Sequence, residues 1–144
     1  MTRKPVSKHR FSGIRLGQRK SRRYTLTKQV YEDFLSAFGD VSPLHVDDGF
    51  ARKKGFKSKL MHGAILNGFT SHFIGTCFPG KYALLRSVSI QYRSPVYLGD
   101  VLLLNSKVEH KSDATKTLLL DLSWFHAGSK RLIATAKVQV GVTA

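Results

Sequence analysis

The sequence contains a single cysteine, few acidic residues and no long apolar run, and each scarcity excludes a class of protein. Cys77 alone forms neither an intramolecular disulfide nor a zinc cluster, so the fold must depend on a packed core. No apolar run approaches the roughly 18 residues that cross a bilayer. The N-terminal stretch MTRKPVSKHRF lacks the apolar segment of a secretory signal. We therefore expect no membrane association and a location inside a cell, in the cytoplasm or, in a eukaryote, the mitochondrial matrix.

Acidic residues number 9 against 24 lysines and arginines, which leaves a formal net charge of +15. Residues 1–23 carry nine of these basic side chains and no acid. A field of this sign attracts phosphorylated cofactors, acidic proteins or nucleic acid without identifying which of them binds. A solvated tail is the other interpretation of a charge run. For residues 1–13, which we treat as a basic N-terminal extension, both interpretations stay open.

The remaining composition is that of one globular domain, with 144 residues of which 42% are hydrophobic and 23% charged. These values are far from the low hydrophobicity of disordered chains, so a packed fold is expected. No internal repeat is visible, and glycine and proline divide the chain into a helical first half and a strand-rich second half. We place the domain at residues 14–144.

The first half predicts three helices. Thr27 is a suitable N-cap for a helix whose apolar residues recur at three- and four-residue spacing up to Gly39. The heptapeptide GDVSPLH cannot continue this helix, because Pro43 lacks an N–H, so a fixed loop follows. A short helix is expected at 47–54. Residues 62–77 are apolar around much of the helix surface and predict a rod of about 24 Å that is buried on several sides.

The second half predicts an antiparallel sheet. Apolar and polar residues alternate in four segments, which are residues 87–93, 101–111, 118–126 and 132–142. The connections between the last three are short and turn-rich, which allows hairpins and excludes helical crossovers. A sheet with one apolar face can curl around a helix that is apolar on several sides. The predicted fold class is therefore α+β, a single hot-dog domain in which a curved antiparallel sheet wraps around a long central helix.

One loop and the start of the central helix contain the candidate catalytic residues. Asp40 and His45 alone are weak evidence, because a loop Asp commonly caps a turn and a loop His is commonly a surface residue. With His62-Gly63 at the helix start and Ser71 two turns later, the pattern resembles the MaoC-like hydratases, the hydratase type 2 family that includes (R)-specific enoyl-CoA hydratases. The resemblance runs from an opening strand at 14–18 to the last strand, through GDVSPLHVDDGFA, GFKSKLMHGAIL and FPGKYALLRSVSIQYRSPVYLGD.

The resemblance implies hydration of a trans-2-enoyl thioester, or the reverse dehydration of an (R)-3-hydroxyacyl thioester. Asp40 and His45 would hold one water molecule between them, and a histidine suits acid–base work near neutral pH. The backbone N–H of Gly63, at a helix N-terminus, would stabilise charge on the thioester oxygen. Ser71 matches a serine that helps to fix the catalytic loop, with an ordinary helix contact as the alternative. Ser42 replaces the family's usual asparagine, which implies a different acyl group or a lower activity.

A metal site is the first alternative use of these side chains. Asp40 and His45 lie close in sequence to Asp47 and Asp48, but no second histidine lies at helical spacing. The family also works without metal, so we expect none. We expect no separate cofactor either, because coenzyme A or phosphopantetheine would be part of the substrate.

A run of lysines lies shortly before the proposed oxyanion donor, and its members are Lys53, Lys54, Lys57 and Lys59. A solvated face is the default interpretation of such a run. Since the family's substrate ends in phosphates or in an acidic carrier protein, the alternative is a docking surface for that end.

The resemblance also implies a homodimer or higher homo-oligomer, because in the hot-dog fold the neighbouring subunit usually completes the acyl site. The expected partner is a thioester of coenzyme A or of acyl carrier protein. One alternative function is a hot-dog acyl thioesterase, which the Asp40/His45 pair disfavours. The other is a non-catalytic basic binding module on the same fold. We do not expect nucleic acid as a partner, because no recognition helix or stacking motif is visible.

Overall fold

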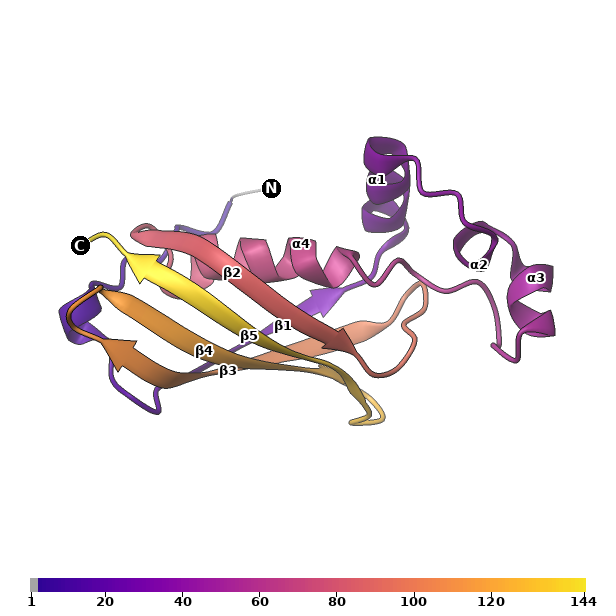
Figure 1. Cartoon of the computed structure of the whole chain (residues 1–144). Helices are drawn as coiled ribbons and strands as arrows, with labels where there is room; N and C mark the ends of the chain where they lie inside the picture. The colour runs from indigo at the N-terminus through magenta and orange to yellow at the C-terminus, as the bar shows by residue number, and fades with distance from the viewer. Residues whose placement is uncertain (1–2) are drawn as a thin grey trace.

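The computed structural model describes residues 3–144, which contain a five-stranded antiparallel sheet. The strands follow the order β1-β3-β4-β5-β2, so β1 and β2 are the two edges. Their bounds are Arg19–Thr25 (β1), Ala83–Tyr92 (β2), Val101–Ser112 (β3), Thr117–His126 (β4) and Leu132–Val142 (β5). Helix α4 (Ile65–His72) runs along one face of the curved sheet (Figure 1).

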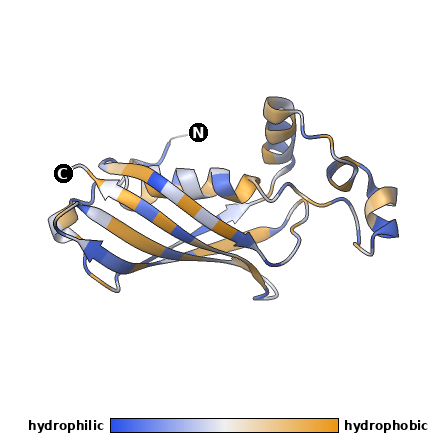
Figure 2. Cartoon of the chain, viewed as in Figure 1, coloured by the Kyte–Doolittle hydropathy of each residue, from blue (hydrophilic) through white to orange (hydrophobic). Residues whose placement is uncertain are grey.

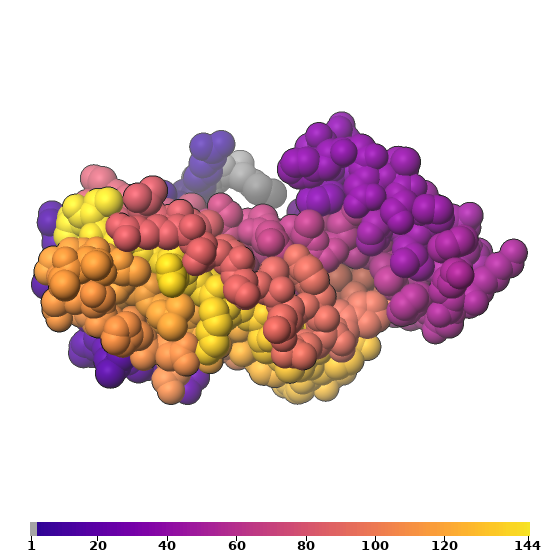
Figure 3. Space-filling view, viewed as in Figure 1, coloured from indigo at the N-terminus to yellow at the C-terminus, as the bar shows by residue number. Residues whose placement is uncertain are grey.

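The other helices precede α4 in the chain. Helices α1 (Lys28–Phe38), α2 (Pro43–Val46) and α3 (Asp48–Lys53) lie beyond one end of the sheet (Figure 1) and project from it as a lobe (Figure 3). The Thr27 hydroxyl accepts a hydrogen bond from the Val30 N–H at 3.1 Å, which confirms the predicted cap of α1. Helix α4 continues into a π-helix, η2 (Phe73–Cys77), and a short 3-10 turn, η1 (Phe11–Gly13), lies near the N-terminus.

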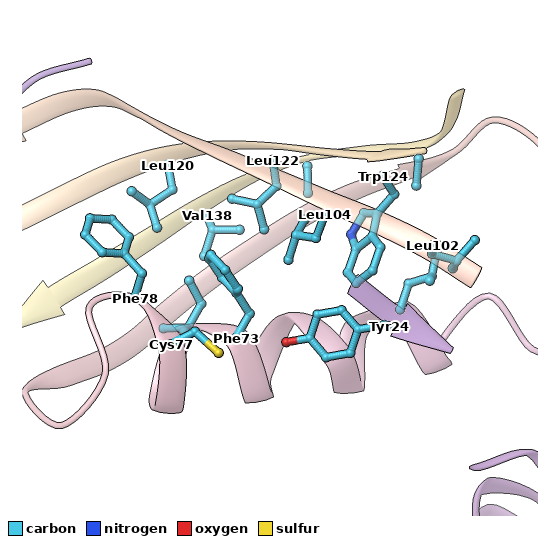
Figure 4. Packing of buried hydrophobic residues seen from close by; sticks show 14 of the residues in the cluster. Tyr24, Phe73, Cys77, Phe78, Leu102, Leu104, Leu120, Leu122, Trp124 and Val138 are labelled. Carbon is cyan, nitrogen blue, oxygen red and sulfur yellow. The ribbon is translucent and has the colours of Figure 1, made fainter. Parts of the chain in front are cut away.

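The core lies between the sheet and the central helix. Bands of apolar and polar residues alternate along the strands (Figure 2), because successive side chains of a strand point to opposite faces. The inner-face residues Leu120, Leu122 and Trp124 are fully buried and pack with Phe73 and Tyr24 (Figure 4). These features confirm the α+β hot-dog architecture. The strands of the second half agree with the predicted segments to within a few residues.

Three local predictions were wrong. The first strand is not at 14–18 but at Arg19–Thr25, after a turn at residues 16–17. Pro43 begins the helical turn α2 instead of lying in a loop, because proline is tolerated at the first position of a helix. The central helix begins at Ile65, after a turn in which the Ile65 N–H donates to the carbonyl of His62.

The burial of the central helix also differs from the prediction. Ile65 and Leu66 face the core, but the opposite side of the helix is exposed in the single chain. The exposed positions recur every three or four residues and include small side chains, namely Ala64, Gly68, Ser71 and Gly75. The helix is therefore buried on the side of the sheet and open on the other.

Residues 7–14 of the basic N-terminal segment pack against the domain. The Ser7 N–H donates to the Thr76 carbonyl at 2.9 Å, and the Ser7 carbonyl accepts from the Lys81 N–H at 2.8 Å. Gly80 permits this close approach, because its φ is +87° and a Cβ there would lie 2.1 Å from the Ser7 carbonyl oxygen. Phe11 continues the segment into the core with 5% exposure. Across residues 3–144, no helix has the length and apolar character that a membrane span requires.

Candidate active site

A pocket of about 490 Å³ opens at the N-terminal end of α4. Its lining comes from Asp40 and His45, from residues 56–66, and from residues 92–96 after β2. This volume is typical of small-molecule sites. The apolar lining includes Phe56, Leu60, Met61, Leu66 and Val96, and the polar lining includes Asp40, His45, His62, Tyr92 and Arg93. The structure thus brings the predicted pair to one cavity with the start of the central helix.

Helix α2 is held in place by contacts on both sides. The Tyr31 hydroxyl of α1 donates to the His45 carbonyl at 2.7 Å. On the other side, the Leu60 N–H donates to the Leu44 carbonyl at 2.8 Å, and the next residue, Met61, donates its N–H to the Val96 carbonyl at 2.9 Å. These bonds connect α1, α2 and the segment after β2, so they determine where His45 stands in the pocket.

The hydrogen bonds of His45 define its tautomer. Its Nδ1 lies 3.0 Å from the Leu60 carbonyl oxygen. A carbonyl only accepts hydrogen bonds, so Nδ1 must carry the hydrogen. In the neutral ring, Nε2 is then left with a lone pair and has no partner among residues 3–144. This is the form of imidazole that can accept a proton.

Asp40 is held by its backbone and by a local turn. One carboxylate oxygen, Oδ1, accepts from the Ser42 N–H at 3.2 Å, as aspartate commonly does in turns. The Asp40 carbonyl lies 2.8 Å from Nε2 of His62, which must donate to it. The Ser42 hydroxyl has no hydrogen-bond partner within the described chain, so Ser42 supports the loop through its backbone and not through its side chain.

His62 was not among the predicted site residues, although it contacts both Asp40 and His45. Its side chain is 1% exposed, and its ring centroid lies 4.1 Å from that of His45 and 4.7 Å from that of Phe34. Its Nε2 holds the Asp40 carbonyl, while its buried Nδ1 has no partner among residues 3–144. The signal available in the sequence was a histidine in an otherwise apolar segment, directly before Gly63.

Gly63 lines the same cavity. Gly63 precedes α4, and within residues 3–144 its N–H has no hydrogen-bond acceptor, as expected at a helix start. The Tyr92 ring covers it so closely that a Cβ at Gly63 would lie 3.1 Å from two ring carbons. The Tyr92 hydroxyl donates to Oδ1 of Asn67, and burial raises the pKa of this tyrosine. Tyr92 is therefore a fixed, neutral wall beside the free N–H.

The distances between the polar atoms of Asp40, His45 and His62 indicate whether they could bind a metal ion or a water molecule. Ligating atoms of Asp40, His45 and His62 all lie within 4.8 Å of one another, so the fold supplies the second histidine that the sequence spacing lacked. In a tetrahedral zinc site with bonds of about 2.0–2.1 Å, ligand atoms lie about 3.3 Å apart. Two partners of one water molecule, each at about 2.8 Å, lie about 4.6 Å apart. An upper limit of 4.8 Å is compatible with both arrangements, a metal ion and a shared water molecule.

The other predicted residues lie outside the pocket. Ser71 is exposed on α4, and no hydrogen bond joins it to the loop among residues 3–144. Of the four lysines, Lys57 lies over the Tyr97 ring at 4.5 Å and Lys59 over the Tyr31 ring at 4.8 Å. These two adjoin Phe56 and Leu60 in the chain, which do line the pocket, whereas Lys54 lies over the Phe50 ring, outside the lining.

Comparison with known families is consistent with this arrangement. The family described as "MaoC like domain" matches residues 13–121, which is most of the chain. The protein therefore belongs to the MaoC-like domain family.

Several relatives and solved structures carry hydratase or dehydratase names. An (R)-specific enoyl-CoA hydratase of Rhodospirillum rubrum is 33% identical over 64% of this chain and 64% of its own length. A mitochondrial 3-hydroxyacyl-[acyl-carrier-protein] dehydratase of Arabidopsis thaliana is 38% identical over 54% of this chain and 48% of its own length. The match therefore spans less than two thirds of either relative. The (R)-hydratase structure from Aeromonas caviae has a TM-score of 0.82 with 24% identity, covers 90% of this chain and 97% of its own, and shows the shared fold.

Proposed function

We propose that the protein adds water to a trans-2-enoyl thioester to form an (R)-3-hydroxyacyl thioester, and catalyses the reverse dehydration. It would then be a hydro-lyase. One observation carries the proposal: Asp40, His45 with an unpartnered imidazole nitrogen, and Gly63 with an unpartnered N–H line one mainly apolar pocket. The names of its relatives point to the same chemistry.

The reaction needs a proton acceptor, a proton donor and a group that stabilises an oxyanion. A water molecule between Asp40 and His45 loses a proton to Nε2 of His45 while its oxygen bonds to C3 of the substrate. The electron pair of the double bond moves toward the thioester oxygen, where the N–H of Gly63 stabilises the negative charge. His45 then returns the proton to C2, and Asp40 orients the water throughout.

The surroundings of these groups favour the reaction. Met61, Leu66 and Val96 are buried apolar residues of the lining and offer contact to an acyl chain. A bound acyl chain displaces water from this lining, and a dipole in such surroundings interacts more strongly with developing charge than it does in water. Coenzyme A or phosphopantetheine enters as part of the substrate, and the proposed mechanism requires no metal.

The direct test is the consumption of crotonyl-CoA, followed as the loss of the enoyl absorbance. We expect Asp40→Asn and His45→Gln each to lower turnover about a hundredfold or more. Asp33→Asn and His110→Gln are matched controls on exposed positions outside the pocket. Near-normal turnover in a well-folded Asp40 or His45 variant would exclude the mechanism, and release of free thiol would indicate a thioesterase.

We propose that Lys53, Lys54, Lys57 and Lys59 receive the phosphate or carrier-protein end of the substrate. The support is the place of Lys57 and Lys59 next to pocket-lining residues and the charge that all four share. Replacing all four by glutamine should raise the KM for crotonyl-CoA and leave kcat nearly unchanged. A short crotonyl-pantetheine substrate should be insensitive, and an equal loss of kcat on both substrates would refute docking.

We also propose a homodimer that joins through β2. This edge strand exposes Leu84 by 54% and Tyr92 by 50%, and it lies beside the exposed small-residue side of α4. A second copy would cover both surfaces and the pocket mouth. Leu84→Glu should shift the mass in solution toward the monomer, whereas Leu16→Glu, at a still more exposed position outside β2, should not. A wild-type monomer at assay concentration would refute the proposal.

A further inference from the structure

A second cavity, of about 470 Å³, lies at the other end of the central helix. It is bounded by residues 4–7 of the N-terminal segment, by residues 20–23 of β1, and by Thr76 and Cys77 of η2. Gly63 lines the first pocket and Thr76 lines the second. At 1.5 Å per residue, these two residues lie about 20 Å apart along the central helix. The two cavities are therefore distinct sites.

Four cations line this second cavity, and they are Lys4, Lys20, Arg22 and Arg23. They come from two segments that the fold brings together, because the Ser7 N–H is tied to the Thr76 carbonyl. No acidic residue lines the cavity, and none of the ion pairs found within residues 3–144 includes any of the four cations. Like charges held together without a counter-charge repel one another, so the fold maintains a local excess of positive charge here.

Arg22 is the fixed member of this group. Its Nη1 donates to Sγ of Cys77 at 2.9 Å, and its guanidinium carbon lies 5.4 Å from the centre of the Tyr24 ring. These two contacts orient the guanidinium plane, and its remaining N–H groups have no acceptor among the described residues. A planar guanidinium with free N–H groups can bind two oxygens of one phosphate in parallel. Ser7 and Ser21 also line the cavity, and the Ser21 hydroxyl donates to Oδ1 of Asn105.

We propose that this cavity binds the diphosphate group of a small nucleotide. The inference rests on this cavity alone and not on the proposed reaction. A concave site of this size suits a small ligand, whereas docking of a protein buries a broad surface of about 800 Å² on each partner. One fixed arginine, with two lysines and a second arginine beside it, gives two kinds of contact to a diphosphate, directed hydrogen bonds and diffuse charge. The same chemistry occurs in a free nucleotide and in the phosphate end of a coenzyme A thioester.

The test is isothermal titration of the full-length protein with ADP and with inorganic pyrophosphate at low ionic strength. We expect both to bind. The double variant Lys4→Gln, Lys20→Gln removes two exposed charges without touching the Arg22 contacts, and it should weaken binding about tenfold. Arg22→Gln should weaken it further, with thermal unfolding as the check on its fold. The matched control is Lys116→Gln, Lys130→Gln, which removes the same charge at two exposed positions outside both this cavity and the lysine run, and it should change affinity less than about twofold.

Two results would overturn the proposal. One is the absence of binding by both ADP and pyrophosphate, and the other is an equal loss of affinity in the control, which would indicate only a general charge effect. A second experiment distinguishes the two sources of the phosphate by measuring the KM for crotonyl-CoA in the Lys4→Gln, Lys20→Gln double variant. An unchanged KM assigns the cavity to a free nucleotide, and a raised KM assigns it to the substrate's own phosphates. Because titration does not depend on turnover, failure of the proposed reaction would leave this test intact.

Discussion

The contact of His62 with the Asp40 carbonyl leads to a prediction that separates positioning from chemistry. An asparagine at position 62 carries its amide nitrogen near the place of Nδ1, whereas a glutamine can carry its amide nitrogen near the place of Nε2. His62→Asn therefore loses the 2.8 Å hydrogen bond to Asp40, and His62→Gln can keep it. The two variants are otherwise similar, since each replaces an aromatic ring with a neutral amide.

The expected magnitude follows from that bond. A hydrogen bond of this kind contributes about 1 kcal/mol net, within a range of about 0.5–1.5. Asp40 is exposed, so water can replace the donor and the larger penalty of a buried unpaired carbonyl does not apply. If the loss of this hydrogen bond loosens the Asp40 loop and raises the activation free energy by about that amount, turnover falls about five- to tenfold in His62→Asn. We expect His62→Gln to stay within about twofold of the wild type.

Both variants also lose the packing of a buried ring against His45 and Phe34, so both should unfold at lower temperature than the wild type. The assay measures kcat and KM for crotonyl-CoA together with thermal unfolding of each variant. A positioning role predicts a lower kcat in the asparagine variant with a nearly constant KM. Equal turnover in the two variants, at comparable stability, would refute the role of the Nε2 bond.

Three further predictions concern the scaffold. Gly80→Ala should destabilise the protein by about 2–4 kcal/mol and lower Tm by about 10 °C. The reason is that the Cβ of the new alanine would lie 2.1 Å from the Ser7 carbonyl oxygen. Gly13→Ala is the control and should have little effect, because no atom lies within 4 Å of the Cβ position there. Ser42→Ala should leave turnover nearly unchanged, since the loop is held by the Ser42 N–H, and a large loss of kcat would show that the hydroxyl contributes. Burial and then the nearby Arg22 lower the pKa of His72, so the folded protein binds fewer protons there than the unfolded chain, and stability should fall as the pH drops below about 6.5. His72→Gln should reduce this acid-induced fall in Tm, and an unchanged pH dependence of Tm would contradict the assignment.

The sequence by itself determined the elements that depend on local patterns. Alternating apolar residues identified the strands of the second half, because the side-chain period of a strand is two and one face is buried. Thr27 and Gly39 marked the ends of α1, because caps act on backbone groups within a few residues. The motif with Asp40, His45 and Gly63 located the candidate site, and all three residues line one pocket.

Only the tertiary structure decided how distant groups meet. It joins His62 to Asp40 across 22 positions of the chain, and no local pattern reports such a contact. It exposes one side of the central helix, at small or polar residues such as Gly68 and Ser71, which the prediction of a helix buried on several sides did not separate from the apolar residues that face the sheet. It also assembles Lys4, Lys20, Arg22 and Arg23 around one cavity, since Gly80 lets the N-terminal segment approach η2. Periodicity is a property of neighbours along the chain, whereas a site depends on the folded distance between residues that are far apart in sequence.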